Sequence, residues 1–288
     1  MDLAAVVLLE VLYVIASLII ISSGLAMIFG MMKIINFAHG EFMMLGGYTT
    51  IVCVKAGANI YLAMLVIAPL IVGMIGLLLE RLVIRHLYGR LVDTMLATWG
   101  ISMILIGIVT MIFGNTTESI STPIKGWAIG DYQVNGYNFF IILVAIGLVC
   151  SGYFLLKFTR LGLIVRGAMQ DPNVAASLGY NPDRIYMTTF FMGAALSGLA
   201  GGILAPLVGL VPSWGTAYIA KAFITVVVGG PAIIVGLVSS ATLFGSVNQI
   251  FAFIFNPVFG EVALLLCAVI LLRILPKGIT NSIFKGKL

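Results

Sequence analysis

Charged residues are scarce in this chain of 288 residues, because Asp, Glu, Lys and Arg together make up only 9% of it. Soluble domains carry about a quarter of their residues charged, so the composition excludes an ordinary soluble fold. Hydrophobic residues supply 61% of the chain, and the mean hydropathy is +1.19. At about 20 residues for each membrane-spanning helix, this length allows eight or nine helices and little else. We therefore expect an all-α, polytopic transmembrane helical bundle that forms a single membrane domain over residues 1–288.

The residues that build enzyme and metal sites are also few. The three cysteines, Cys53, Cys150 and Cys267, are odd in number and not at ligand spacing, which argues against a disulfide framework and a zinc site. The only two histidines are His39 and His86, and neither a His-Glu-x-x-His motif nor a Gly-x-Ser-x-Gly elbow is present. A Gly-x-x-x-x-Gly-Lys-Ser/Thr loop is absent, so the chain is not itself a P-loop ATPase. A potassium-channel filter of the Thr-Val-Gly-Tyr-Gly type is absent as well. We expect no catalytic residue, no metal and no cofactor bound to this chain.

The distribution of basic residues predicts the orientation of the spans. Apolar runs predict spans at 3–30, 36–54, 60–80, 92–113, 138–157, 185–210 and 261–276, with a broken apolar region over 216–256. Basic residues cluster at 81–90, at 157–184 and at 273–287, which places these three regions in the cytoplasm and the loop 114–137 outside. The net charge of +5 is explained by these loops, so it does not indicate a nucleic-acid partner. We expect a cytoplasmic C-terminus, and the first run, preceded by Asp2, is expected to be an uncleaved span.

The later spans contain rows of small residues, which favour close helix packing, and a Gly-Gly-Pro sequence, which interrupts a helix. Small residues recur every four positions in two adjacent rows, which allows helix backbones to approach closely in lipid. The rows are Gly193, Ser197, Gly201 and Ala205, and Ala194, Gly198 and Gly202. Pro206 is expected to end or kink this helix. Gly229-Gly230-Pro231 predicts a discontinuous helix or a tight hairpin inside the region 216–256.

Segment 34–47 places polar groups inside an apolar stretch. Asn36, His39 and Glu41 would each be costly in hydrocarbon unless they face a cavity, a pore or a protein partner. If the segment is helical, Asn36, His39 and Gly40 share a face and Glu41 turns away. One interpretation is a broken helix that lines a translocation path. The other is an interfacial turn at the cytoplasmic headgroups, which the preceding Lys33 favours.

The basic segment 157–185 predicts a short helix between two spans. Asp171 or Asn173 can cap it, residues 174–178 would form it, and Gly179 would end it. Such a helix fits the groove of a partner protein, but an ordinary interfacial loop helix would have the same sequence features.

Lys221 is the only basic residue in a long apolar stretch. Its side chain can reach the outer membrane interface, or it can pair with an acidic group or with a substrate carboxylate in a cavity.

Three stretches of the chain resemble the permease subunits of bacterial ABC importers for branched-chain amino acids, a family whose relatives also import urea and short-chain amides. They are Gly30 to Tyr48, which contains Asn-Phe-Ala-His-Gly-Glu, Arg160-Leu-Gly through Ala175-Ala-Ser-Leu-Gly179, and Lys221-Ala-Phe through Gly230. The resemblance extends over nearly the whole chain. One departure is Pro231-Ala-Ile-Ile-Val-Gly236, which stands where the family usually has a Gly-Ser-containing loop.

The resemblance implies a permease that works in the bacterial inner membrane by alternating access. Its partners would be a second related permease or a copy of itself, two cytoplasmic ATP-binding subunits that hold ATP and Mg²⁺, and a periplasmic or extracellular substrate-binding protein. It further implies inverted repeats, whose broken segments 34–47 and 215–231 meet near the middle of the membrane. The residues implied for the translocation path are Asn36, Phe37, His39, Gly40, Glu41, Lys221, Phe223, Gly229 and Gly230. Those implied for ATPase coupling, within about 160–184, are Arg160, Arg166, Asp171, Ala175, Ala176, Gly179 and Arg184.

Other functions stay open at this point. The substrate could be urea or a short-chain amide in place of an amino acid. The chain could also act alone as a proton-coupled carrier, with His39 or Glu41 changing charge during transport. An intramembrane enzyme is poorly supported, because no nucleophile and base occur together in a recognisable pattern.

Overall fold

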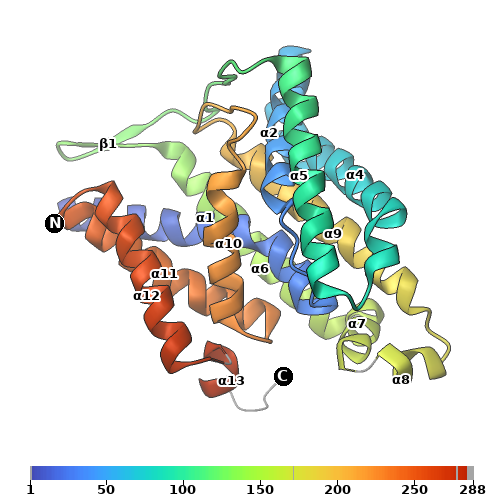
Figure 1. Ribbon diagram of the computed structural model, residues 1–288. Coiled ribbons are helices and arrows are strands. Elements are labelled where there is room, and N and C mark those ends of the chain that lie inside the picture. Colours follow the sequence, from blue (N-terminus) through green and yellow to red (C-terminus); the bar gives the residue numbers. More distant parts are fainter. Residues whose placement is uncertain (1, 171, 277, 284–288) are drawn as a thin grey trace. The chain divides into compact units, whose positions relative to one another are not determined.

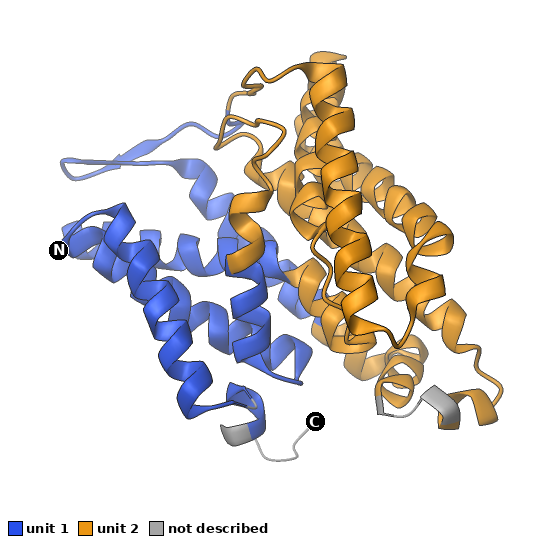
Figure 2. Cartoon of the chain, viewed as in Figure 1, with its two compact units in different colours: residues 1–22, 122–152, 221–288 blue, residues 23–121, 153–220 orange. Residues whose placement is uncertain are grey.

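The computed structural model describes residues 2–170, 172–276 and 278–283 (Figure 1). The described chain is largely helical, and one antiparallel pair of short strands, β1 (Trp127–Ile129) and β2 (Tyr132–Val134), lies in the loop before α6 (Gly136–Phe158). The chain forms two compact units (Figure 2). Unit 1 contains residues 1–22, 122–152 and 221–288, and unit 2 contains residues 23–121 and 153–220.

Seven helical stretches among the described residues are long and apolar enough to cross a membrane. They are α1 (Asp2–Met32), the stretch Ile60–Leu82, α5 (Leu91–Phe113), α6 (Gly136–Phe158), α9 (Pro182–Leu204), α11 (Ile233–Ile254) and a stretch that begins with α12 (Pro257–Ile274). The shorter helices are α2 (His39–Lys55), η2 (Ile84–Leu87), α7 (Arg160–Gln170), α8 (Pro172–Ser177), α10 (Thr216–Gly229) and α13 (Ile279–Ile283). The prediction of a polytopic helical bundle is confirmed. The seven stretches are fewer than the eight or nine expected, and the predicted span 36–54 corresponds to α2, which has 17 residues and is not among them.

Caps and proline positions explain where several helices begin and end. Asn59 accepts hydrogen bonds from the first turn of α3 (Ile60–Leu62), and Asn181 and Asn256 do the same for α9 and α12. The stretch Ile60–Leu82 contains a π-helical turn, η1 (Ala63–Ile67), directly before α4 (Ala68–Leu82). Pro69 lacks a backbone N–H, so the wider turn accommodates its ring without ending the helix. Helix α9 ends at Leu204, earlier than the predicted 210, because Pro206 cannot continue it.

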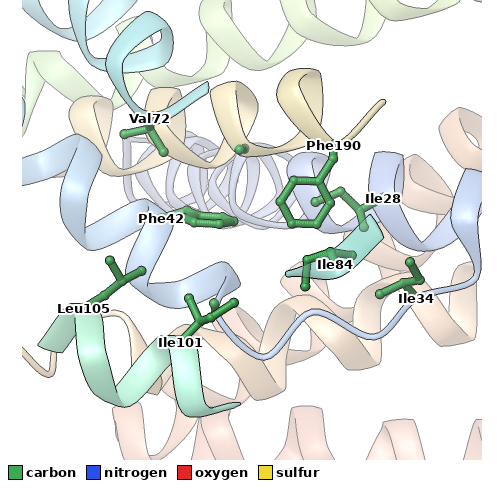
Figure 3. Close-up of a cluster of buried hydrophobic side chains, with 10 residues drawn as sticks. Ile28, Ile34, Phe42, Val72, Ile84, Ile101, Leu105 and Phe190 are labelled. Carbon is green, nitrogen blue, oxygen red and sulfur yellow. The ribbon is translucent and has the colours of Figure 1, made fainter. Parts of the chain in front are cut away.

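Helix α9 lies at the centre of unit 2, and its small residues determine its packing. A Cβ added at Gly201 would lie 1.7 Å from the carbonyl oxygen of Met43 on α2, and one at Gly198 would meet Val72 of α4 at 2.7 Å. Phe190 of α9 packs edge-on against Phe42 of α2, with ring centroids 6.1 Å apart (Figure 3). The predicted packing role of the small-residue rows is confirmed, because α2 and α4 approach α9 at these positions.

Helix α10 begins in unit 2 and continues in unit 1 from Lys221, where it forms with α11 the tight hairpin that Gly229-Gly230-Pro231 predicts. Helix α10 ends at Gly229, Gly230 has a φ of 87°, and α11 begins at Ile233. The backbones of Gly229 and Gly236 are so close that a Cβ on Gly229 would lie 2.7 Å from Gly236. Glycine is required at these positions because a positive φ and a backbone contact both exclude larger side chains.

Candidate translocation site

Asn36 lies in the turn that precedes helix α2 and is not part of the helix. Its Oδ1 accepts a hydrogen bond from the Ala38 N–H at 3.0 Å, and its carbonyl accepts one from the His39 N–H at 3.3 Å. Asparagine favours such turns over helix interiors, because its side chain competes for nearby backbone N–H groups. The predicted helix 36–54 therefore starts at His39, and the expectation that Asn36, His39 and Gly40 share a helix face is wrong.

The polar groups of this segment are buried in protein. Asn36, His39 and Glu41 are each exposed by no more than 1%. An exposed turn among lipid headgroups, the second interpretation of the sequence, would not show such burial. The burial favours a segment held between helices of unit 2, where its polar groups depend on protein partners.

Helices α2 and α10 meet end to end at two glycines of unit 2. A Cβ on Gly40 would lie 2.3 Å from the Gly215 carbonyl oxygen, and one on Gly215 would lie 2.0 Å from the Gly40 carbonyl oxygen. Gly40 is the second residue of α2, and Gly215 directly precedes α10. The N-terminal ends of both short helices therefore touch, with their backbone in direct contact. Gly40 of the segment 34–47 and Gly215 of the segment 215–231 are thus in contact within unit 2, and the position of this contact in the membrane stays a prediction.

His39 connects α2 to the centre of unit 2. Its Nδ1 lies 2.9 Å from the Ser197 hydroxyl on α9, and that hydroxyl donates to the Gly193 carbonyl at 2.9 Å. A hydroxyl has a single proton, so the arrangement is satisfied when His39 Nδ1 is the donor and Ser197 the acceptor. His39 thereby holds the first turn of α2 against α9.

Two buried groups of the segment have no hydrogen-bond partner in the described part of the chain. They are the Nδ2 of Asn36 and both carboxyl oxygens of Glu41. The Ser102 hydroxyl on α5 lies near the Glu41 carboxyl group, but its position does not give a hydrogen bond to either carboxyl oxygen. Such groups destabilise a fold by roughly 1 to 3 kcal/mol each. They point to a functional requirement, because packing alone would favour apolar side chains here.

The neighbouring Phe37 is held by α5. Its backbone N–H donates to the Thr98 hydroxyl at 3.1 Å. This contact fixes the irregular segment before α2 against α5, so the segment is supported on both sides, by α5 and by α9.

Lys221 forms an ion pair within unit 1. Its Nζ lies 2.6 Å from a carboxyl oxygen of Glu261 on α12. Of the two possibilities open from the sequence, the structure shows pairing with an acidic group. Two hydroxyls bond to backbone carbonyls of α10: Ser240 of α11 donates to the Thr225 carbonyl at 2.7 Å, and Thr280 of α13 donates to the Gly229 carbonyl at 2.8 Å.

The predicted coupling segment contains two helices, α7 and α8. Helix α8 ends before Gly179, whose φ of 87° confirms the predicted stop. Ala175 is buried and Ala176 is exposed. The Nε of Arg166 donates to the Gly162 carbonyl within α7. The predicted cap Asp171 lies outside the described residues.

The predicted path residues belong to two different units of the chain. Residues 36–41 form one group in unit 2, whereas Lys221, Phe223, Gly229 and Gly230 belong to unit 1. Three contact residues were missed from the sequence, namely Ser197 as a partner of His39, Thr98 as a partner of Phe37, and Glu261 as the counter-ion of Lys221. Glu261 offered a signal, because a carboxylate at the start of an apolar run needs a partner.

Comparison with known proteins gives consistent results. The family described as "Branched-chain amino acid transport system / permease component" matches residues 7–275 of the chain. A probable branched-chain amino acid transport permease protein, LivH, of Methanocaldococcus jannaschii is 27% identical over 292 residues, covering 93% of this chain and 90% of that protein. LivH of Escherichia coli K12 and BraD of Pseudomonas aeruginosa, both described as high-affinity branched-chain amino acid transport system permease proteins, are 26% and 28% identical, each covering 90% of both chains. No solved structure matches the chain.

Proposed function

Because the chain belongs to the permease family of branched-chain amino acid transport systems, we propose that it is the membrane-spanning subunit of an ATP-driven importer. Its cargo would be branched-chain or other small neutral amino acids, the substrate class in the names of its relatives. The chain would lie in the plasma membrane with its C-terminus on the cytoplasmic side, as the distribution of basic residues indicates.

The observation that carries this proposal is the junction of α2 and α10 in unit 2. Two short helices meet there by their N-terminal ends at Gly40 and Gly215, next to the unpartnered Glu41 and Asn36. Transporters commonly place the ends of broken helices at the substrate path, because the exposed N–H groups and the helix dipole interact with charged substrate groups. The direct glycine contact leaves no room for a substrate between the two ends, so this contact would have to open during transport.

The remaining path residues have distinct roles in this proposal. Asn36, His39 and Glu41 are polar lining or gating groups, and His39 also holds α2 to α9 through Ser197. Lys221 and Glu261 neutralise each other within unit 1. Phe37 and Phe223 supply apolar surface for aliphatic side chains. Gly229 and Gly230 allow the sharp turn after α10.

The energy would come from partner subunits. Two ATP-binding proteins would hold ATP and Mg²⁺ and bind to α7 and α8. A second related permease or a copy of this chain would complete the translocation path. A substrate-binding protein outside the membrane would deliver the amino acid. The exposed Ala176 lies on α8 between residues 160 and 184, where a partner surface can reach it.

A substitution on the exposed side of α8 tests this coupling role. Ala176→Arg adds a bulky charge to the exposed side of α8, so ATP-driven uptake should fall at least tenfold while the unfolding free energy changes by no more than about 0.5 kcal/mol. Ala175→Arg is unsuitable, because Ala175 is buried and the change would disturb the fold itself. Full uptake by Ala176→Arg, with the ATP-binding subunits still attached, would contradict the coupling assignment.

The unpartnered carboxyl group of Glu41 favours a second candidate, a proton-coupled carrier that acts alone. Proteoliposomes separate the two functions. One preparation contains this chain alone with an imposed proton gradient, and the other contains the complete assembly with ATP inside and substrate-binding protein outside. The importer predicts leucine uptake only in the second preparation, unaffected by a protonophore. Uptake by the chain alone, driven by the proton gradient, would overturn the proposal.

A further inference from the structure

A loop of unit 2 is attached to the segment that leads into α10. The loop consists of residues 114–121 and follows α5, and the segment consists of residues 205–215 and connects α9 to α10. The Glu118 N–H donates to the Leu210 carbonyl at 2.9 Å, and the Leu210 N–H donates to the Glu118 carbonyl at 2.8 Å. Within the described residues, segment 205–215 forms no other backbone-to-backbone hydrogen bond with a distant part of the chain. Glu118 is therefore the main backbone attachment of this segment.

Side chains add to this attachment without making it strong. The Glu118 carboxylate forms an ion pair with Lys55 at the end of α2, and the two side chains are 24% and 56% exposed. Thr117 lies directly on Gly209, because a Cβ added to this glycine would be 2.4 Å from the Thr117 methyl group. An ion pair between partly exposed groups contributes little to stability, and each hydrogen bond contributes modestly. The loop can therefore leave segment 205–215 at a small cost in free energy.

Segment 205–215 extends this attachment to the glycine contact between the ends of α2 and α10. The Leu210 side chain is fully buried in a cluster with apolar residues of α2 and α5. A turn follows, in which the Trp214 N–H donates to the Val211 carbonyl at 2.9 Å. Gly215 comes next and forms the contact itself. A short piece of chain thus joins Leu210, the backbone partner of Glu118, to the glycine contact.

The loop can be reached from outside the membrane, whereas the glycine contact cannot. The distribution of basic residues predicts that loop 114–137 lies on the outer side, and Asn115, Thr116 and Ser119 are exposed. Gly40 and Gly215 are both buried. An event at the outer surface can therefore act on the buried contact through Glu118.

We propose that Glu118 is a positioning residue for transport, because it holds loop 114–121 against segment 205–215 and thereby keeps Gly215 on Gly40. Release of the loop would allow the two helix ends to separate, as the proposed importer function requires. The link to transport rests on that function, whereas the hold of Glu118 on the glycine contact is a property of the purified chain.

Amide hydrogen–deuterium exchange of the purified full-length chain tests the hold of Glu118. For Glu118→Gln we expect exchange to rise by roughly three- to fivefold, both in segment 205–215 and in the first turn of α2. Lys55→Gln should give the same pattern, and exchanging the charges, with Lys55→Glu and Glu118→Lys together, should restore slow exchange. Asp93→Asn is the matched control, because it breaks an exposed ion pair at the other end of α5 and should leave both regions unchanged.

A reversible cross-link tests the consequence for transport. Thr117→Cys and Gly209→Cys are combined in a chain whose three natural cysteines are replaced by alanine. The two Cβ atoms would lie 3.9 Å apart, a separation that suits a disulfide. In the complete assembly with ATP and substrate-binding protein, the disulfide should lower leucine uptake about tenfold, and reduction should restore it. Ala128→Cys with Gln133→Cys is the control, because it links two exposed, directly opposite residues of β1 and β2 and leaves loop 114–121 unlinked.

Two outcomes would overturn the proposal. The first is exchange in Glu118→Gln that is unchanged, or that rises only in residues 114–121 and 205–212, because the loop would then have a local structural role. The second is full leucine uptake by the oxidised Thr117→Cys, Gly209→Cys chain, with mass spectrometry showing a complete disulfide. A failure of the importer function gives a different result: the unaltered assembly would take up no leucine with ATP, while exchange in the purified Glu118→Gln chain would still rise in the first turn of α2.

Discussion

The start of α2 and the hairpin of α10 and α11 both interrupt apolar helices, but they differ in whether their polar groups have hydrogen-bond or ionic partners. In the hairpin, Lys221 is paired with Glu261 of α12, and Thr225 and Ser240 each donate to a backbone carbonyl. Thr280 of α13 donates to the Gly229 carbonyl at the turn. At the start of α2, the Nδ2 of Asn36 and both oxygens of Glu41 are buried without a partner. These polar groups of the hairpin have partners, whereas the start of α2 contains buried polar groups without one.

This difference has a physical interpretation. A buried polar group without a partner destabilises the state that contains it, and a state that supplies a partner is stabilised in relation to it. A transporter that alternates between two states can use such groups, since they favour movement away from the closed contact. We therefore assign the larger role in gating to the start of α2 and the larger role in support to the hairpin.

The largest expected change in the free energy of unfolding comes from disrupting the packing of α2 against α9. Gly201→Leu places side-chain atoms where the Met43 carbonyl oxygen lies, because even a Cβ would be 1.7 Å away. We expect a loss of roughly 3 kcal/mol in the free energy of unfolding, measured by thermal unfolding in detergent. Gly107→Leu is the matched control, because no atom lies within 4 Å of a Cβ at that position. Equal unfolding of the two variants would show that α9 does not hold α2.

Removing the attachment of His39 should have a smaller effect. Ser197→Ala leaves Nδ1 of His39 without its partner on α9, which should lower the free energy of unfolding by about 1 to 2 kcal/mol. Ser239→Ala, which removes a hydroxyl that bonds only within α11, is the comparison variant. A change no larger than that of Ser239→Ala would contradict the role of His39 as the attachment of α2.

Breaking the ion pair of the hairpin should have the smallest effect on stability. Glu261→Gln leaves Lys221 without its counter-ion, but both side chains are partly exposed, so water replaces much of the interaction. We expect a loss of about 1 kcal/mol and nearly normal ATP-driven uptake. An uptake defect of tenfold or more, at unchanged stability, would move the gating role from α2 to the hairpin.

Much of this architecture could be predicted from the sequence, because it depends on local rules. The rows around Gly193 and Gly201 predicted close helix packing, Pro206 predicted the end of α9, and Gly229-Gly230-Pro231 predicted the hairpin. These features follow from side-chain size and backbone freedom, which a sequence shows directly.

The contacts of the site could not be predicted to the same extent. The place of Asn36 in the turn before α2 depends on a choice between turn and helix that short sequence windows do not decide. The partners Ser197 and Glu261 lie 158 and 40 residues from His39 and Lys221, so only the folded chain brings them together. The lack of a partner for Glu41 is likewise a property of the packed structure.

Stability and transport, measured together for Glu41→Gln, test the gating role of the start of α2 most directly. The amide removes a buried carboxyl group that has no partner to lose, so the unfolding temperature should equal or exceed that of the unaltered chain. ATP-driven uptake of leucine by the complete assembly should fall at least tenfold in the same preparation. Unchanged uptake, or a fall in uptake that only follows a loss of stability, would show that the start of α2 is an ordinary part of the core.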